Sequence, residues 1–252
     1  MPHPIQGKTA LITGASRGIG EAAARRLVAL GANVVLTARS EEALQALAAE
    51  LGSQALAVHC DVADYASVKA ATDKAVDHFG GLDVLVNNAG VIDPIARLDE
   101  SDPAEWGKVV DINLKGVYHC IHAALPHMRA QASGIIINIS SGAATGALEG
   151  WSHYCSTKAA VLSLTRCVHK EYTELGIRCV GLSPGTVATQ MQVSIKASGV
   201  NPVSRLDWET HISPEWVGEA IAWLTTDAAR EHDGGDFSLK TDEGRRAVGL
   251  IA

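Results

Sequence analysis

Short runs rich in β-branched residues alternate with longer stretches rich in alanine and leucine along most of this chain. The short runs are continuously apolar over about six residues, which is typical of parallel strands buried on both faces. We expect six strands in the first three quarters of the chain, at residues 8–13, 33–38, 55–60, 82–87, 134–140 and 177–183. This pattern excludes an all-helical fold.

The stretches between these runs have helical periodicity. In the first of them Ile19, Ala23 and Leu27 recur at helical spacing, and Gly31 provides the stop signal. We expect helices at residues 18–30, 41–51, 66–79, 103–129, 152–175 and 214–226, and a last strand at 236–239. Strands and helices that alternate so regularly form βαβ units. The predicted fold is therefore a doubly wound α/β parallel sheet, a Rossmann fold, in a single domain over residues 1–252.

One segment, 190–207, has no clear periodicity. An irregular segment of this length in a compact domain is either disordered or functional. It follows the sixth strand, on the side where such sheets bind their ligands. We therefore expect residues 190–210 to form a substrate lid.

The net charge, the apolar stretches, the cysteines and the histidines argue against several classes of function. A net charge of −7 over 252 residues argues against a broad nucleic-acid surface, and no apolar stretch is long enough to span a membrane. The five cysteines form no CxxC pair and no signal peptide is evident, so we expect reduced thiols and a cytoplasmic location. His119, His122 and His127 lack a nearby acid or cysteine that would complete a metal site, and we expect no metal.

A glycine-rich turn connects the first predicted strand to the first predicted helix. Such a turn can be purely structural, but here it lets backbone N–H groups approach a pyrophosphate at the helix N-terminus. The turn predicts a dinucleotide site at Gly14, Ser16, Arg17, Gly18, Ile19 and Gly20.

The end of the second strand indicates which dinucleotide binds. An NAD site of this design usually has an Asp or Glu there, which hydrogen-bonds the ribose 2′-hydroxyl. Here Arg39 follows the strand, no acid is present, and Arg17 in the glycine turn can approach the same group. Two guanidinium groups suit a 2′-phosphate, although both could simply be solvated surface residues. The sequence predicts NADP(H).

Tyr154 and Lys158 lie four residues apart on a predicted helix and therefore share a face. A free tyrosine has a pKa of about 10. A nearby ammonium should lower the pKa of the Tyr154 phenol, so that it acts as general acid or base. Ser141 lies thirteen residues before Tyr154, just past the fifth strand. Its hydroxyl is expected to hydrogen-bond a substrate carbonyl oxygen at the same sheet edge.

Taken together, these motifs identify a family resemblance over residues 7–224. The glycine turn, Asp61, Asn87–Gly90, Asn113, Ser141, the Tyr154/Lys158 pair and Pro184–Gly185 occur in the order found in short-chain dehydrogenases/reductases. The resemblance implies that Lys158 also holds the nicotinamide ribose and that Asn113 holds a water that relays protons. It further implies cofactor contacts from Asp61, Val62, Asn88, Ala89, Gly90, Pro184, Gly185, Val187 and Thr189, besides Tyr154 and Lys158.

Four residues are candidates for the substrate pocket: Ala143, Leu148, Trp151 and Met191. They are small or apolar, and no Arg or Lys is expected near the reaction centre, which favours a neutral ketone. Residues 150–155 and 189–192 are similar to the benzil-reductase and sepiapterin-reductase branch. That similarity implies an α-dicarbonyl substrate as a hypothesis.

Two other functions remain open at this point. A 3-oxoacyl-carrier reductase would need a basic face for an acidic carrier, and the sequence does not show where Lys115 and Arg129 lie. A non-catalytic NADP-binding regulator would be favoured if Ser141, Tyr154 or Lys158 were replaced, and none is. We expect a homodimer or homotetramer built partly on helices 103–129 and 152–175. The tail 240–252 departs from the family pattern.

Overall fold

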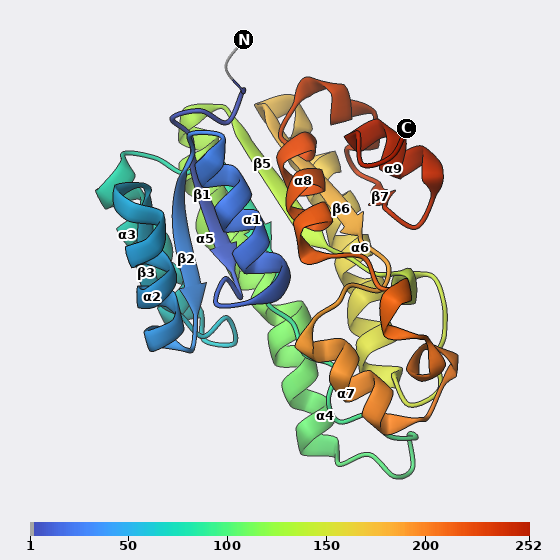
Figure 1. Cartoon of the computed structure of the whole chain (residues 1–252). Coiled ribbons are helices and arrows are strands. Elements are labelled where there is room, and N and C mark those ends of the chain that lie inside the picture. Colours follow the sequence, from blue (N-terminus) through green and yellow to red (C-terminus); the bar gives the residue numbers. More distant parts are fainter. Residues whose placement is uncertain (1–2) are drawn as a thin grey trace.

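The computed structural model describes residues 3–252, whose strands form one seven-stranded, fully parallel sheet (Figure 1). The strand order is β3-β2-β1-β4-β5-β6-β7. The strands are β1 (Thr9–Thr13), β2 (Asn33–Ala38), β3 (Ala55–His59), β4 (Val84–Asn87), β5 (Gly134–Ile139), β6 (Ile177–Ser183) and β7 (Asp236–Ser238). The chain crosses from the β3 edge to β4 beside β1, so the strand order reverses between β1 and β4. The predicted doubly wound sheet is confirmed.

Successive residues of the central strands face opposite sides of the sheet, and each side has its own apolar core. In β1, Ala10 and Ile12 belong to one core and Leu11 to the other. Both cores are buried, which explains why the strands are continuously apolar rather than alternating.

Helices cover both faces of the sheet (Figure 1). Their bounds are α1 (Gly18–Ala29), α2 (Glu41–Leu51), α3 (Tyr65–Phe79), α4 (Pro103–Val110), α5 (Gly116–Gln131), α6 (Ser152–Tyr172), α7 (Gln190–Ser198), α8 (Pro214–Leu224) and α9 (Asp242–Val248). The core on one face includes residues of α1, α2 and α8, and the core on the other includes residues of α3, α5 and α6. Within residues 3–252, no helix has the length and apolarity needed to cross a membrane.

The predicted continuous helix 103–129 is interrupted. A π turn, Asp111–Lys115, separates α4 from α5, and Asn113 lies inside it. A π turn inside an α-helix often marks a functional site.

The expectation of an irregular segment at 190–207 is wrong for its first half, because α7 occupies Gln190–Ser198. Gln192 and Ile195 lie three residues apart and form the buried side of this helix, and Gly199 ends it in the left-handed conformation. The buried face carries a polar glutamine, so the apolar periodicity that predicts a helix was absent from the sequence.

Candidate active site

One elongated cavity of about 1460 Å³ lies at the carboxyl ends of the strands. Nearly all the predicted site residues line it: Gly14, Ser16, Arg17, Gly18, Ile19, Arg39, Asp61, Val62, Asn88, Ala89, Gly90, Ser141, Ala143, Leu148, Trp151, Tyr154, Lys158, Pro184, Gly185, Val187, Thr189 and Met191. The exceptions are Gly20 and Asn113, which are buried and do not line the cavity.

The glycine turn is tied tightly to the loop after β4. The hydroxyl of Thr13 accepts hydrogen bonds from the backbone N–H groups of Asn88 and Ala89, both at 3.0 Å. The Asn88 side chain in turn donates to the carbonyl oxygens of Thr13 and Gly14, at 2.9 and 3.1 Å. A β-carbon on Gly20 would collide with the backbone of the same turn. Gly20 therefore allows α1 to begin directly against the turn.

The glycine turn and the start of α1 fit a bound dinucleotide. Arg17 is the N-cap residue of α1 and its side chain makes no capping hydrogen bond, so the first N–H groups of the helix are available to a phosphate. The exposed guanidinium groups of Arg17 and Arg39 line the cavity, and neither forms a salt bridge within the described part of the chain.

Tyr154 and Lys158 lie one turn apart on α6 and are both buried, with 8% and 6% of their surfaces exposed. The Lys158 Nζ lies 5.6 Å from the centroid of the Tyr154 ring. The Ser141 hydroxyl, two residues past the end of β5, lies close to the Tyr154 phenol. The three groups that the sequence assigned to catalysis therefore meet in one place.

The pKa of Tyr154 is raised in this structure and not lowered, in contrast to the prediction. Burial raises the pKa of the Tyr154 phenol to about 12, and the nearby Ser141 hydroxyl opposes this rise. Burial also lowers the pKa of Lys158 to about 8. The spacing of four residues correctly placed the lysine beside the tyrosine, but it contained no information about the desolvation of both groups.

Asn113 is buried and anchors the wall of the cavity. Its Oδ1 accepts from the N–H of Val91 and its Nδ2 donates to the carbonyl oxygen of Val91, both at 2.8 Å. The side chain thus clamps the π turn to the loop after β4. Both ends of the Asn113 side-chain amide are engaged by Val91, and Asn113 does not line the cavity.

Asp236, a residue that the sequence did not single out, lies close to Ser140 and Lys158. Its carboxylate accepts hydrogen bonds from Ser183 at 2.7 Å and from Ser140 at 3.2 Å. Its charge raises the pKa of Lys158, in opposition to the effect of burial. Burial raises the pKa of Asp236 itself. As the first residue of a short strand, it carried no motif that could have indicated this role.

The four predicted substrate residues belong to an apolar cluster around Tyr154. The ring of Trp151 packs edge-on against Tyr154, with centroids 5.6 Å apart and planes at 74°. Ala143, Leu148 and Met191 complete the cluster together with Ile92 and Ile195. His153 does not line the cavity. Its Nδ1 accepts from the N–H of Tyr154 at 2.7 Å, which leaves Nε2 to donate to the Pro94 carbonyl oxygen.

The expectation that no Arg or Lys lies near the reaction centre is wrong. Lys240 and Arg245 both line the cavity. Lys240 lies two residues after β7, and the residues just past a parallel strand lie at the ligand-binding edge of the sheet. The sequence places Lys240 just after the predicted strand 236–239, but this position alone does not show which residues Lys240 approaches.

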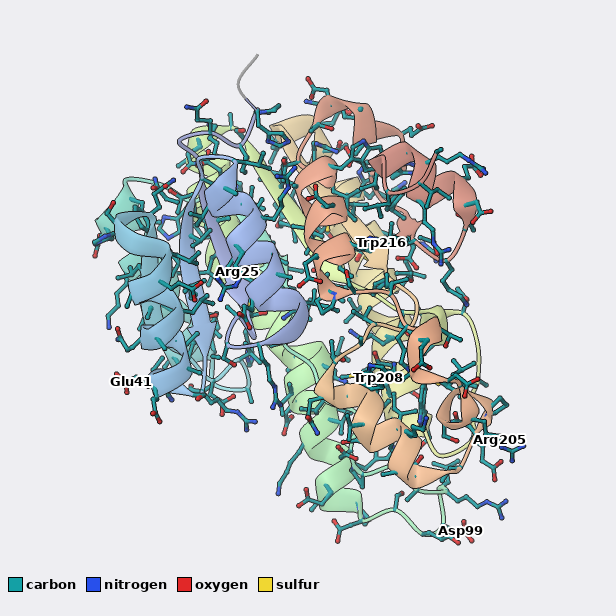
Figure 2. All side chains as sticks on the ribbon, in the orientation of Figure 1. Arg25, Glu41, Asp99, Arg205, Trp208 and Trp216 are labelled. Carbon is teal, nitrogen blue, oxygen red and sulfur yellow. The ribbon has the colours of Figure 1, made fainter. Side chains whose placement is uncertain are left out.

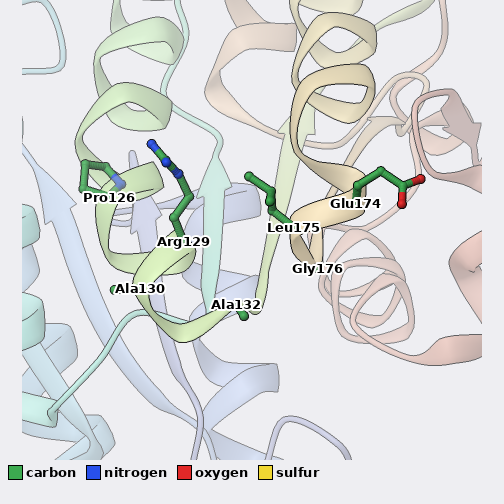
Figure 3. Close-up of a pocket in the computed structure, with 7 residues that line it drawn as sticks. All are labelled: Pro126, Arg129, Ala130, Ala132, Glu174, Leu175 and Gly176. Carbon is green, nitrogen blue, oxygen red and sulfur yellow. The ribbon is translucent and has the colours of Figure 1, made fainter.

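A second hollow, of about 730 Å³, lies away from this chemistry (Figure 3). It is formed by the end of α5 and by residues 174–176, which follow α6, and Arg129 and Leu175 are among its lining residues. No group of three or more His, Cys, Asp or Glu side chains suited to a metal occurs among residues 3–252.

Known proteins share both the sequence and the fold. The chain is 41% identical to cis-4-hydroxycyclohexanecarboxylate dehydrogenase of Sinomonas cyclohexanicum, over 91% of this chain and 93% of that protein. It is 37% identical to 3-oxoacyl-[acyl-carrier-protein] reductase FabG of Staphylococcus aureus, over 88% of this chain and 92% of that protein.

A solved structure with the same fold is a 3-ketoacyl-(acyl-carrier-protein) reductase from Brucella melitensis complexed with NADH. The TM-score is 0.82 and the identity 30%, over 93% of this chain and 97% of that one. The short chain dehydrogenase family model matches residues 8–199. The chain belongs to the short-chain dehydrogenase/reductase family of oxidoreductases.

Proposed function

We propose that this chain is an NADP(H)-dependent carbonyl reductase, or an alcohol dehydrogenase in the reverse direction, with Tyr154 as the general acid and base. One observation carries the proposal. The Tyr154 phenol, close to the Ser141 hydroxyl and to Lys158, opens into the same cavity as the glycine turn. A carbonyl group between the two hydroxyls would meet two hydrogen-bond donors.

The bound nicotinamide would supply the hydride for reduction or accept it in oxidation. Side chains of this protein supply the proton that the carbonyl oxygen takes up. Ser141 polarises the carbonyl oxygen, and Tyr154 donates its phenolic proton to that oxygen as negative charge develops on it. The Lys158 ammonium stabilises the phenolate that remains.

The preference for NADP(H) rests on Arg17 and Arg39. Both guanidinium groups face the cavity without an acidic partner among the described residues, and no Asp or Glu directly follows β2. A carboxylate at that position would repel a 2′-phosphate, whereas a guanidinium can bind it bidentately.

The substrate is proposed to be a small ketone or secondary alcohol. The prediction of a neutral ketone assumed that no cation lies near the reaction centre, and Lys240 removes this premise. The α-dicarbonyl hypothesis stays a prediction. The name of the Sinomonas relative, a dehydrogenase of a hydroxycyclohexanecarboxylate, supports a small hydroxy compound as substrate.

Reduction of a 3-oxoacyl group on an acidic carrier is the second candidate. The similarity to two reductases of this name favours it. The two cations considered for carrier docking do not, because Lys115 pairs with Asp111 at 2.6 Å and Arg129 lies at the second hollow (Figure 3). We therefore place the carrier reductase second.

We propose that α7 and the following residues up to 210 act as a substrate lid. Met191, Val203 and Trp208 line the cavity from this segment. Trp208 lies beside α7 and keeps 41% of its surface exposed (Figure 2). A half-exposed tryptophan beside the entrance can pack on a bound substrate.

A cytoplasmic location and a dimer or tetramer complete the proposal. All five cysteines are free thiols, which suits a reducing compartment.

The test is a substrate panel followed by NADPH or NADH absorbance. It contains simple ketones, α-diketones, oxo acids and a 3-oxoacyl thioester. We expect turnover of at least one small ketone class, with NADPH preferred. Turnover of the thioester alone would favour the carrier reductase, and NADPH binding without any turnover would favour a regulator.

A further inference from the structure

Lys240 places a cation at the catalytic end of the cavity. Its stem crosses Gly185, with Cγ 3.0 Å from the point that a β-carbon on Gly185 would occupy. Its Nζ lies 3.3 Å from the corresponding point on Gly142, the residue next to Ser141. Two glycines thus leave room for the side chain to lie across the cavity wall, with its ammonium beside the residue that follows the catalytic serine.

The ammonium of Lys240 has no partner among residues 3–252: it forms neither a salt bridge nor a side-chain hydrogen bond there. Nearby acids are already engaged, because Asp236 accepts from two serine hydroxyls and Asp242 faces Arg245 at 3.8 Å.

Arg245, the other cation at this end, is held in place. Its Nε donates to the Leu239 carbonyl oxygen at 2.8 Å, and its guanidinium lies 5.8 Å from the ring of Trp216, on α8 (Figure 2). Lys240 is therefore the cation at the catalytic end that is available to a ligand.

The surroundings of Lys240 restrict the ligand further. The same cavity is lined by Ile92, Leu148, Trp151 and Met191, which belong to the apolar cluster around Tyr154. A ligand that contacts both Lys240 and the apolar cluster has an apolar body and a single anionic group. An exposed cation without a partner, which lines the same cavity as an apolar cluster, favours an anion with which it can make a charge-assisted hydrogen bond.

We propose that Lys240 binds the carboxylate of the substrate, so that the preferred substrates are apolar oxo acids and the corresponding hydroxy acids. This inference rests on the proposed carbonyl reductase function and specifies its substrate class. Tyr154 and Ser141 bind the reacting oxygen, and Lys240 anchors the far end of the substrate and fixes its orientation.

The test compares each oxo acid with its methyl ester, for example 4-oxopentanoate and methyl 4-oxopentanoate, and 4-acetylbenzoate and its methyl ester. Losing a hydrogen bond to a charged group costs roughly ten- to hundredfold in affinity. We expect the wild type to prefer the acids, and Lys240→Met to raise KM for the acids by that factor. The KM values for the esters and for NADPH should not change, and Lys240→Arg should retain part of the preference.

Lys74→Met is the matched control, since this exposed lysine of α3 does not line the cavity. Calorimetric binding of acid and ester to the NADPH complex repeats the comparison without turnover. An equal loss for acids and esters, or a rise in KM for NADPH alone, would overturn the proposal for Lys240. If no ketone of either kind is turned over while the acids still bind through Lys240, the proposed function and the substrate class fail, and only carboxylate binding by Lys240 stands.

Discussion

The buried ammonium of Lys158 donates a hydrogen bond to the carbonyl oxygen of Ile139 at 2.6 Å. This contact fixes α6 to the end of β5, the two elements that carry Tyr154 and Ser141. The lysine therefore orients the site as well as supplying charge. The charge of Asp236 raises the pKa of Lys158, and two serine hydroxyls donate hydrogen bonds to the Asp236 carboxylate.

The first prediction concerns pH. Carbonyl reduction needs Lys158 protonated, and the pKa of Lys158 is lowered to about 8, so the rate should fall as pH rises through that value. In Asp236→Asn the charge that raises the pKa of Lys158 is gone, and the fall should occur at lower pH. The measurement is kcat/KM against pH, with Asp227→Asn, an exposed acid, as control. An unchanged profile in Asp236→Asn would refute the coupling.

The second prediction concerns cofactor choice. Arg39→Ala should raise KM for NADPH roughly ten- to hundredfold, because a charge-assisted hydrogen bond to phosphate is lost. The KM for NADH should stay nearly the same. Arg129→Ala is the control, since this arginine lines the second hollow and not the cavity. Equal effects on both cofactors would mean that Arg39 does not bind a 2′-phosphate.

The third prediction compares two glycines. A β-carbon on Gly20 would lie 2.9 Å from the Cα of Ala15, with the Gly14 carbonyl oxygen nearer still, whereas nothing lies within 4 Å of one on Gly107. Gly20→Ala should lower the free energy of unfolding by about 2 kcal/mol or more and weaken NADPH binding. Gly107→Ala, inside α4, should raise it by up to about 1 kcal/mol. Denaturant unfolding of both variants checks this, and equal stabilities would contradict it.

The fourth prediction concerns the buried ion pair of Arg178 and Asp233, whose side chains are 7% and 9% exposed. Asp233→Asn leaves the guanidinium charge buried without its counter-ion and should lower the free energy of unfolding by about 3–5 kcal/mol. The exposed pair of Asp227 and Arg230 is the control, and its removal should cost less than about 1 kcal/mol. Thermal or urea unfolding distinguishes the two, and similar losses would contradict the prediction.

The sheet was predictable from the sequence because burial on both faces makes each strand continuously apolar. The glycine turn and the Tyr154/Lys158 spacing likewise predicted residues that the fold brings together. In contrast, α7 was missed because its buried face includes Gln192, which broke the apolar pattern. Local spacing could predict neighbours but not the tertiary burial that sets the pKa values of Tyr154 and Lys158.

Lys240 and Asp236 were missed for a related reason. Both come from the last strand and the turn after it, far along the chain from Ser140, Gly142 and Gly185, which they approach. Contacts of this kind depend on the order of strands in the sheet, which places β7 beside β6. No local motif encodes them.

The most direct test of the central claim is NADPH oxidation by Tyr154→Phe, with the best ketone of the panel. This variant keeps the ring that packs on Trp151 and removes only the hydroxyl. We expect kcat to fall about a hundredfold or more, since the general acid is lost. NADPH binding, followed by fluorescence, should be retained. Tyr118→Phe, which changes an exposed tyrosine, should behave as the wild type. A Tyr154→Phe variant that reduces the ketone at the wild-type rate would contradict the account.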